Sequence, residues 1–324
     1  MLLRHRWISH VRSSSALSLA LGVGVFGCSS STAHTGSSRP MTSDGPKKDH
    51  DAGAPEGAVA PPAEATIAPV CHGPGYAGSP TKQQFSHLSA TVVDDGGKAV
   101  SNVVAQACGT NVCLNGTTES NGSVIIDQKP EVALTKPAFK YGGGQAYVRF
   151  ALPLMGDTVD VDLGKVVTFP FEPPSAGAPL EAGKPAVSNG VTLTVSSRTT
   201  SIEPDPFDFD TPDLKKFRAV EVPMDQAPAA VDPSLEFGML VALTPSATVL
   251  CPAAALSVPN SPGWAPGSKV DLFLHGIDVG EEWAPYGGWA KVSGGAVSAD
   301  GMTIRTDPDG GLPALSVVGI RLAK

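Results

Sequence analysis

The stretch HGIDVGEEW places His275 close in sequence to three carboxylates, Asp278, Glu281 and Glu282. A histidine near carboxylates is suited to general acid–base catalysis. The nearest hydroxyl of interest, Ser268, lies in a Pro-Gly turn and lacks the Gly-x-Ser-x-Gly sequence of a nucleophile elbow. The chain also lacks His-Glu-x-x-His and a glycine-rich phosphate loop opening a helix. We therefore predict no catalytic residues and no enzyme, with a hydrolase as the less favoured alternative.

The segment IEPDPFDFDTPDL, residues 202–214, is a second concentration of carboxylates. Carboxylates at alternating positions are ligands that Ca²⁺ uses. Three prolines stiffen this loop, however, and the central glycine and terminal glutamate of an EF-hand are missing. The segment 307–311 is likewise typical of an ordinary turn. We predict a solvated acidic loop, no metal site and no cofactor. The carboxylates of the loop are Glu203, Asp205, Asp208, Asp210 and Asp213.

Four large aromatic residues fall within 26 residues of a chain that is only 6% aromatic. Aromatic side chains in a loop rich in Gly and Pro can form a platform for sugars or for protein partners. Core filling and turn packing are the favoured alternative. This cluster is nonetheless the predicted site for a ligand, with Glu281 and Glu282 at its rim. Its members are Trp264, Trp283, Tyr286 and Trp289.

The first 27 residues have the layout of a secretory signal peptide. The segment MLLRHRWISHVR carries three arginines and no acid, and an apolar run of 11 residues follows at 16–26. A membrane-spanning helix needs about 20 apolar residues, so this run is too short to be one. Gly27 and Cys28 come directly after it.

Gly27 followed by Cys28 resembles the end of a bacterial lipoprotein signal, whose lipobox has a small residue immediately before the cysteine. Val25 and Phe26 depart from the leucine and the alanine or serine usual there. The resemblance implies cleavage before Cys28 and attachment of several acyl chains to it, which together make a stable membrane anchor. Ser29, rather than aspartate, implies export to the outer membrane, on its periplasmic or cell-surface face. The alternative is an ordinary signal peptide cut nearby, with Cys28 left as a free thiol.

Residues 28–69 are predicted to be a disordered tether, because they are mostly Ser, Gly, Ala, Pro and charged residues with too little aliphatic bulk to fold. Losing the three arginines of the signal changes the formal charge of −8 to −11. An acidic chain with few basic clusters is a poor partner for nucleic acid. We therefore predict no nucleic-acid partner, attachment to the membrane through the lipid, and a cell-envelope protein or glycan as the partner.

With Cys28 assigned to lipid, four of the five cysteines remain, and an even number in an exported chain indicates disulfides. Three full pairings are open. Cys108 and Cys113 flank a Gly/Asn turn, so a bridge between them would close a hairpin. Cys71 and Cys251 would then pair by elimination. A zinc site is disfavoured because the thiols lack paired short spacings and neighbouring histidines.

Residues 70–170 are predicted to be an antiparallel β-sandwich. Valine-rich alternating runs at 88–93, 99–107 and 123–126 are separated by the turn signals DDGG and ESNG. The stretch 88–127 resembles the carboxypeptidase regulatory-like domain, a transthyretin-like sandwich, through DDGGKAV and TTESNG. Glu119 stands where that family usually has aspartate. The resemblance implies a folding and recognition module without peptidase chemistry.

Residues 171–188 are rich in Pro and Gly and are predicted to link this domain to a second β-sandwich at 189–324. Strands are expected at 191–196, 269–274, 289–292, 296–298 and 302–305, between Gly and Asp turns. Through PNSPG, a strand with tryptophan and VSADG, this half resembles a β domain that recurs in bacterial surface proteins. It is more distantly similar to the sandwich of ankyrins and netrin receptors. Neither family implies catalysis.

The sequence thus predicts an all-β protein with two tandem antiparallel β-sandwich domains after a signal peptide and a disordered tether. The 36 glycines and 30 prolines, against 17% charged residues, indicate short elements and many turns rather than long helices. The function we expect is that of a lipid-anchored cell-envelope protein with a non-catalytic binding or structural role. A carbohydrate- or peptide-binding lipoprotein that uses the tryptophan-rich region is the alternative.

Overall fold

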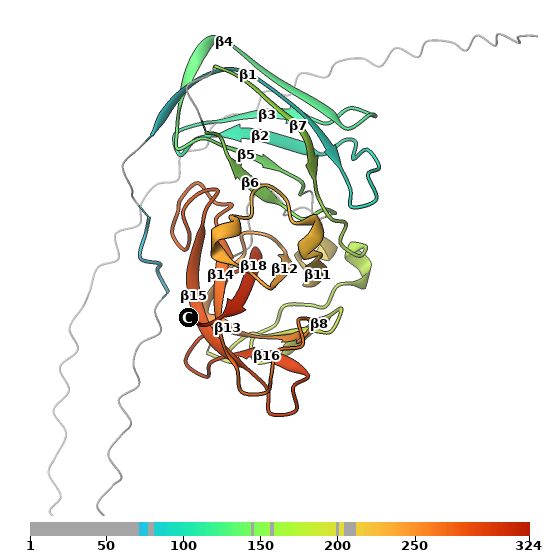
Figure 1. The fold of residues 1–324 in the computed structure, drawn as a ribbon, viewed down its shortest axis with the longest axis vertical. Coiled ribbons are helices and arrows are strands. Elements are labelled where there is room, and N and C mark those ends of the chain that lie inside the picture. The colour runs from blue at the N-terminus through green and yellow to red at the C-terminus, as the bar shows by residue number, and fades with distance from the viewer. Residues whose placement is uncertain (1–70, 77–80, 144–145, 156–158, 199–200, 204–211) are drawn as a thin grey trace, which may run out of the picture. The chain divides into compact units, whose positions relative to one another are not determined.

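The computed structural model describes residues 71–76, 81–143, 146–155, 159–198, 201–203 and 212–324, and the regular structure in them is β (Figure 1). The all-β class is confirmed. No helix within these ranges is long and apolar enough to cross a bilayer. The helical segments here are short 3-10 turns: η1 (Pro174–Ala176), η3 (Pro212–Lys215), η4 (Met224–Gln226) and η5 (Pro233–Leu235).

The first half of the described chain forms two sheets, with strand orders β4-β1-β7 and β3-β2-β5-β6. Figure 1 shows them as two layers. β1 pairs antiparallel with β4 but parallel with β7, an exception to the antiparallel pairing that the sequence predicts. The chain crosses from β6 in one sheet to β7 in the other, and this crossover lets β7 run in the direction of β1. The strands are β1 (Lys82–Val93), β2 (Val104–Cys108), β3 (Cys113–Thr117), β4 (Ser123–Thr135), β5 (Ala138–Tyr141), β6 (Phe150–Pro153) and β7 (Asp160–Val167).

The second half forms one 11-stranded sheet, in which nine strands follow the order β11-β12-β18-β14-β15-β16-β13-β9-β8 and β10 and β17 pair with β13. The sheet curls until its ends meet. The Ser188 hydroxyl accepts the Ala219 N–H at 3.1 Å, and the Asn189 amide donates to the Ala219 carbonyl at 2.8 Å. The strands are β8 (Pro185–Ser188), β9 (Val191–Thr194), β10 (Ser201–Glu203), β11 (Arg218–Val222), β12 (Met239–Thr244), β13 (Val249–Pro259), β14 (Lys269–His275), β15 (Trp289–Val297), β16 (Thr303–Thr306), β17 (Leu312–Ala314) and β18 (Val317–Leu322).

Two large hydrophobic clusters form the core. One joins Phe85 and Phe139 of the first half to Phe237 and Phe273 of the second, and the other fills the curled sheet. Each of these phenylalanines is at most 8% exposed, and burying such a side chain contributes about 1.5–3 kcal/mol. The two predicted domains therefore have separate sheets but share one core, and the described residues from Cys71 onward belong to a single compact unit.

The predicted linker at 171–188 was wrong at its end. Strand β8 lies inside it and pairs with β9 through a tight turn, with Ser188 opposite Val191. The turn residues Asn189 and Gly190 both have positive φ, 47° and 76°, as a hairpin of this length requires. The boundary placed at 189 therefore falls within a hairpin. The Asn-Gly pair is the sequence signal that identifies this turn.

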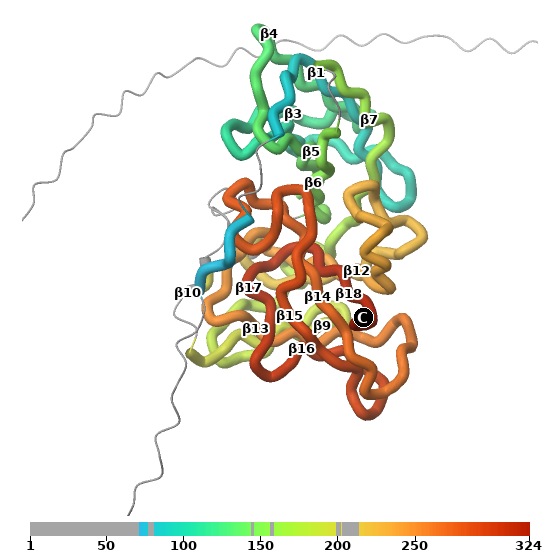
Figure 2. The backbone as a smooth tube through the Cα atoms, turned by 60° about the vertical axis from the view of Figure 1, so that its left-hand side comes forward, coloured from blue at the N-terminus to red at the C-terminus, as the bar shows by residue number. Residues whose placement is uncertain are grey.

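The four cysteines of the described chain lie in two pairs at bonding distance. Cys108 and Cys113 face each other across the β2–β3 hairpin, with Cα atoms 4.0 Å apart. Cys71 is joined to Cys251 of β13, with Cα atoms 5.1 Å apart. Figure 2 shows the segment that begins at Cys71, in blue, lying beside the orange and red strands of the second half. These are the pairings that hairpin geometry and elimination favoured.

Candidate functional site

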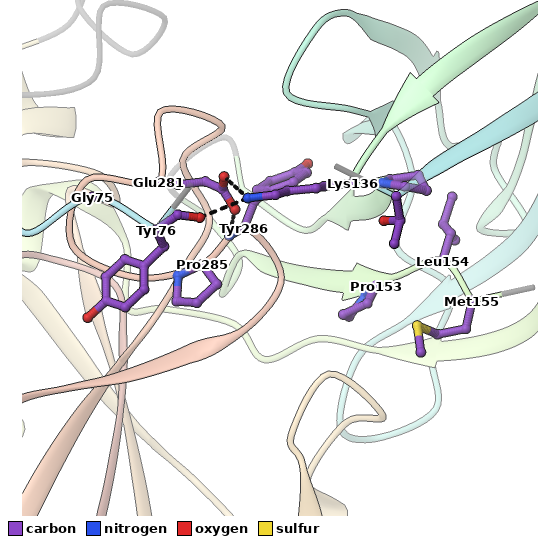
Figure 3. Close-up of a pocket in the computed structure, with 11 residues that line it drawn as sticks. Gly75, Tyr76, Lys136, Pro153, Leu154, Met155, Glu281, Pro285 and Tyr286 are labelled. Carbon is purple, nitrogen blue, oxygen red and sulfur yellow. Dashed lines mark hydrogen bonds and ion pairs between the residues drawn. The ribbon is translucent and has the colours of Figure 1, made fainter. Parts of the chain in front are cut away.

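A pocket of about 510 Å³ opens where five stretches of the chain meet (Figure 3). They are the segment ending at Tyr76, Thr81 just before β1, the turn between β4 and β5, the end of β6 and the loop between β14 and β15. Its volume lies in the range of about 300–1,000 Å³ that is usual for ligand sites. The walls combine apolar residues such as Pro153 and Met155 with one ion pair, Lys136–Glu281.

The ion pair between Lys136 and Glu281 joins three of these stretches. Only 18% of the Lys136 side chain and 10% of the Glu281 side chain are exposed. The ammonium also donates to the Tyr76 carbonyl at 2.8 Å, and the second carboxylate oxygen accepts the Tyr286 N–H at 3.0 Å. Such partners are needed because taking an ion out of water costs several kcal/mol. Figure 3 shows the Lys136 side chain extended toward Glu281 and Tyr76.

Both members of the pair have a left-handed backbone, with φ of 48° at Lys136 and 50° at Glu281. This conformation costs on the order of 1–3 kcal/mol for a residue with a side chain. It is held by backbone contacts: the Lys136 N–H donates to the Thr81 carbonyl at 2.7 Å, and the Glu281 N–H donates to the Asp278 carbonyl at 3.2 Å. Strained residues of this kind concentrate at functional sites. The pocket that contains them is therefore a candidate functional site.

Residues 72–76, the N-terminal strap, contribute Gly75 and Tyr76 to the pocket lining. The Gly75 and Tyr76 N–H groups donate to the carbonyls of Glu282 and Glu281, at 3.2 and 3.1 Å. The Gly73 N–H donates to the Glu282 carboxylate at 3.1 Å. A Cβ at Gly73 would lie 1.9 Å from the Glu282 carbonyl oxygen, so a glycine is required there. Glu282 therefore holds the strap in place.

His275 is a structural residue in this fold. Its ring is 1% exposed. Nδ1 donates to the Gly288 carbonyl at 3.0 Å, and Nε2 accepts the Ala151 N–H of β6 at 3.1 Å. Because β6 is an edge strand, the imidazole satisfies an N–H that no neighbouring strand can pair. Burial lowers the pKa of His275 from 6.5 to about 4, although the Gly288 hydrogen bond opposes the shift.

This low pKa predicts acid sensitivity. The folded protein keeps His275 neutral down to about pH 4, whereas the unfolded chain binds a proton near pH 6.5, so stability is lost as the pH falls through this window. We expect the free energy of unfolding to drop by about 2 kcal/mol between pH 7 and pH 5 on this account. Urea titrations at both pH values should show that His275→Gln flattens the dependence while His87→Gln, at a half-buried histidine of β1, retains it. An equal slope in wild type and His275→Gln would contradict the assignment.

Asp278 and Ser268 do not join His275 in a catalytic arrangement. Asp278 is exposed, and its carboxylate accepts the Gly280 N–H at 3.0 Å. Ser268 precedes β14 and His275 ends it, so their Cα atoms are separated by about 23 Å at about 3.3 Å per residue. His275 and Asp278 therefore serve separate structural roles.

The four predicted aromatic residues do not form one exposed platform. Trp264 and Trp283 pack against the core of the curled sheet, and Trp289 packs against the shared core. The Trp289 indole packs against the tilted His275 ring, with 4.6 Å between ring centroids, and donates to the Ala230 carbonyl. Tyr286 is only 6% exposed. The favoured alternative, core filling, describes the first three, and Tyr286 is the member that lines the pocket.

The predicted acidic loop lies mostly outside the described residues: Asp205, Asp208 and Asp210 fall at 204–211. The segment 307–311 forms a turn in which the Gly310 N–H donates to the Asp307 carbonyl at 2.9 Å. Within the described ranges no group of three or more His, Cys, Asp or Glu is placed to hold a metal.

The fold and the pocket define an all-β protein in which a disulfide and a buried ion pair each join residues distant in sequence. No protein-family model matches the chain, and no curated protein gives a significant sequence match. Among solved structures, the Bacillus anthracis TIE protein is similar at 10% identity and a TM-score of 0.21. The match covers 74% of this chain and 49% of that chain, so this chain spans about half of its length. A TM-score this low does not establish a shared fold.

Proposed function

We propose that the protein is a lipid-anchored component of a bacterial cell envelope with a non-catalytic binding or structural role. The observation that carries this proposal is the pairing of Cys71 with Cys251 and of Cys108 with Cys113. Disulfides persist in oxidising compartments outside the cytosol. A signal peptide at the N-terminus would export the chain to such a compartment. The pairing also accounts for every cysteine except Cys28, the residue that the lipobox-like sequence assigns to lipid.

We further propose that residues 70–170 derive from the carboxypeptidase regulatory-like family and that the remainder is related to the bacterial surface β domain. Two turns support the first part. The Gly97 N–H donates to the Asp94 carbonyl and the Gly122 N–H donates to the Glu119 carbonyl, each at 2.9 Å. Both turns lie at strand ends, where the family motif has them.

The absence of catalysis is supported by His275. Both of its ring nitrogens are occupied by backbone groups, and the ring is buried against Phe150 and Trp289. A general base needs a nitrogen that can reach a substrate. A hydrolase remains the less favoured hypothesis, and it would require detection of a hydrolytic activity that His275→Gln abolishes without unfolding the protein.

Lipidation at Cys28 has a direct test. Mass spectrometry of protein isolated from its own bacterium should give an N-terminal peptide that begins at Cys28 and carries a thioether-linked diacylglycerol and an amide-linked acyl chain. Cys28→Ser should lose both groups and leave the membrane fraction, whereas Cys108→Ala/Cys113→Ala should keep them. An unmodified N-terminus at another residue would reject the anchor.

A second candidate function, binding of a carbohydrate or a peptide, is favoured by the pocket itself. Tyr286 belongs to the predicted aromatic set and lines this pocket together with the Lys136–Glu281 pair. The chemistry of the pocket lining distinguishes between these two ligand classes.

A further inference from the structure

The pocket wall is largely apolar, with hydroxyl groups only from Tyr76, Thr81 and Tyr286 among its described residues. Five of its residues have side chains without a donor or an acceptor of ordinary strength, and three of the five are prolines, which also lack a backbone N–H. A ligand group against this wall gains from burial but loses its hydrogen bonds to water. The five residues are Pro137, Pro153, Leu154, Met155 and Pro285.

The ion pair adds one donor and no net charge. The Lys136 ammonium has three N–H groups, and contacts with Glu281 and the Tyr76 carbonyl occupy two of them in the described structure. The Glu281 carboxylate is in turn bonded by Lys136 and by the Tyr286 N–H. An entering ligand therefore meets a neutralised pair, which favours an uncharged group that carries an acceptor oxygen.

Met155 extends this apolar wall to the surface. Its side chain is 87% exposed, the highest value among the exposed large hydrophobic residues of the described chain. Methionine is flexible and polarisable, and it adapts to irregular apolar partners. Met155 and Pro153 both line the pocket, on the side away from Tyr76 (Figure 3).

From these features we propose that the pocket binds an uncharged, apolar peptide segment of another protein, with a backbone carbonyl of that segment accepting the third N–H of Lys136. This inference rests on the binding role proposed above and decides between its two ligand classes. A glycan presents many hydroxyls, and each hydroxyl placed against proline or leucine would lose hydrogen bonding to water without replacement. An apolar peptide has few such groups, and its carbonyl matches the available donor.

The test uses the whole mature chain carrying Cys28→Ser, observed by amide NMR. The probes are the capped peptide acetyl-Leu-Pro-Leu-Pro-amide and the tetrasaccharide of N-acetylglucosamine. We expect the peptide to shift the amides of Tyr76, Thr81, Leu154 and Tyr286, with a dissociation constant of about 1 mM or tighter, and the sugar to leave them unchanged. Absence of peptide-induced shifts at these amides, or sugar-induced shifts there, would overturn the proposal.

A pair of methionine variants provides the matched control. Met155→Asp places a charge at the pocket edge, while Met302→Asp makes the same change at a second exposed methionine, 70% exposed, outside the pocket lining. Peptide binding should weaken at least about tenfold for Met155→Asp and stay unchanged for Met302→Asp. Equal weakening by both variants, or by neither, would count against this site. Lipid found on Cys28 without peptide binding would reject the ligand while leaving the envelope assignment intact.

Discussion

Replacing Cys71 and Cys251 together with alanine is expected to lower the free energy of unfolding by about 5 kcal/mol. Their disulfide closes a loop with a sequence separation of 180, and the entropy that a cross-link removes from the unfolded chain grows with loop length. The Cys108–Cys113 bridge has a separation of only 5, so the same relation gives about 2 kcal/mol for that pair. Urea titrations of the two double variants, followed by far-UV circular dichroism, measure the difference.

The two double variants control for each other because both remove one disulfide and two sulfur atoms. The Cys71→Ala/Cys251→Ala protein should also expose the N-terminal strap. Without the disulfide, the described contacts that hold the strap are its hydrogen bonds to Glu281 and Glu282 and the hydrogen bond that Lys136 donates to the Tyr76 carbonyl. Hydrogen exchange at Gly75 and Tyr76 should accelerate selectively in this variant. Equal destabilisation by the two double variants would show that the long loop is already constrained in the unfolded chain.

Substituting Lys136 by methionine is expected to cost about 3–5 kcal/mol, because it leaves the Glu281 carboxylate buried without a countercharge. The double variant Lys136→Met/Glu281→Gln should recover part of that loss, since the glutamine keeps an oxygen for the Tyr286 N–H and carries no charge. Thermal and urea unfolding of the single and double variants give the coupling energy.

An exposed ion pair of the same residue types provides the comparison. Lys184 and Glu181 are 69% and 46% exposed, and such pairs contribute about 0–1 kcal/mol. Lys184→Met should therefore change the free energy of unfolding by less than about 1 kcal/mol. If Lys136→Met were as mild as this surface variant, the pair at the pocket would be solvated rather than buried.

Features that depend on local sequence were predictable. Alternating apolar residues place Leu88, Ala90 and Val92 on the buried face of β1, and this period of two can be read directly from the residues. The turn at Asp94–Gly97 and the hairpin between Cys108 and Cys113 depend on chemistry within a few positions. Such elements require no knowledge of distant parts of the chain.

The site could not be predicted in the same way, because its members are distant in sequence. Lys136 and Glu281 are 145 residues apart. The sequence placed Glu281 at the rim of the aromatic cluster, but nothing in it pairs this carboxylate with Lys136. His275 illustrates the converse error. Its neighbours in sequence suggested acid–base chemistry, but the fold buries its ring under Trp289 and Phe150 and uses both nitrogens to satisfy backbone groups.

The core that the two predicted domains share could not be predicted for a similar reason. The alternation of residues within a strand indicates that one face is buried, but it does not indicate which other strand covers it. Phe237 of the second half covers the first, and Trp289 packs against it at 4.9 Å between ring centroids. Phe237 follows η5 and precedes β12, where no regular apolar period identifies it as a core residue.

The bond between Cys71 and Cys251 also determines how mechanical force passes through the molecule. A pull applied at the N-terminal end of the chain reaches Cys71 and crosses the disulfide directly to Cys251 in β13. Residues 72–250, which include the strap, Lys136 and both sheets of the first half, lie off this covalent path. Reduction of this one bond would place all of them on the covalent path between the N-terminal end of the chain and β13.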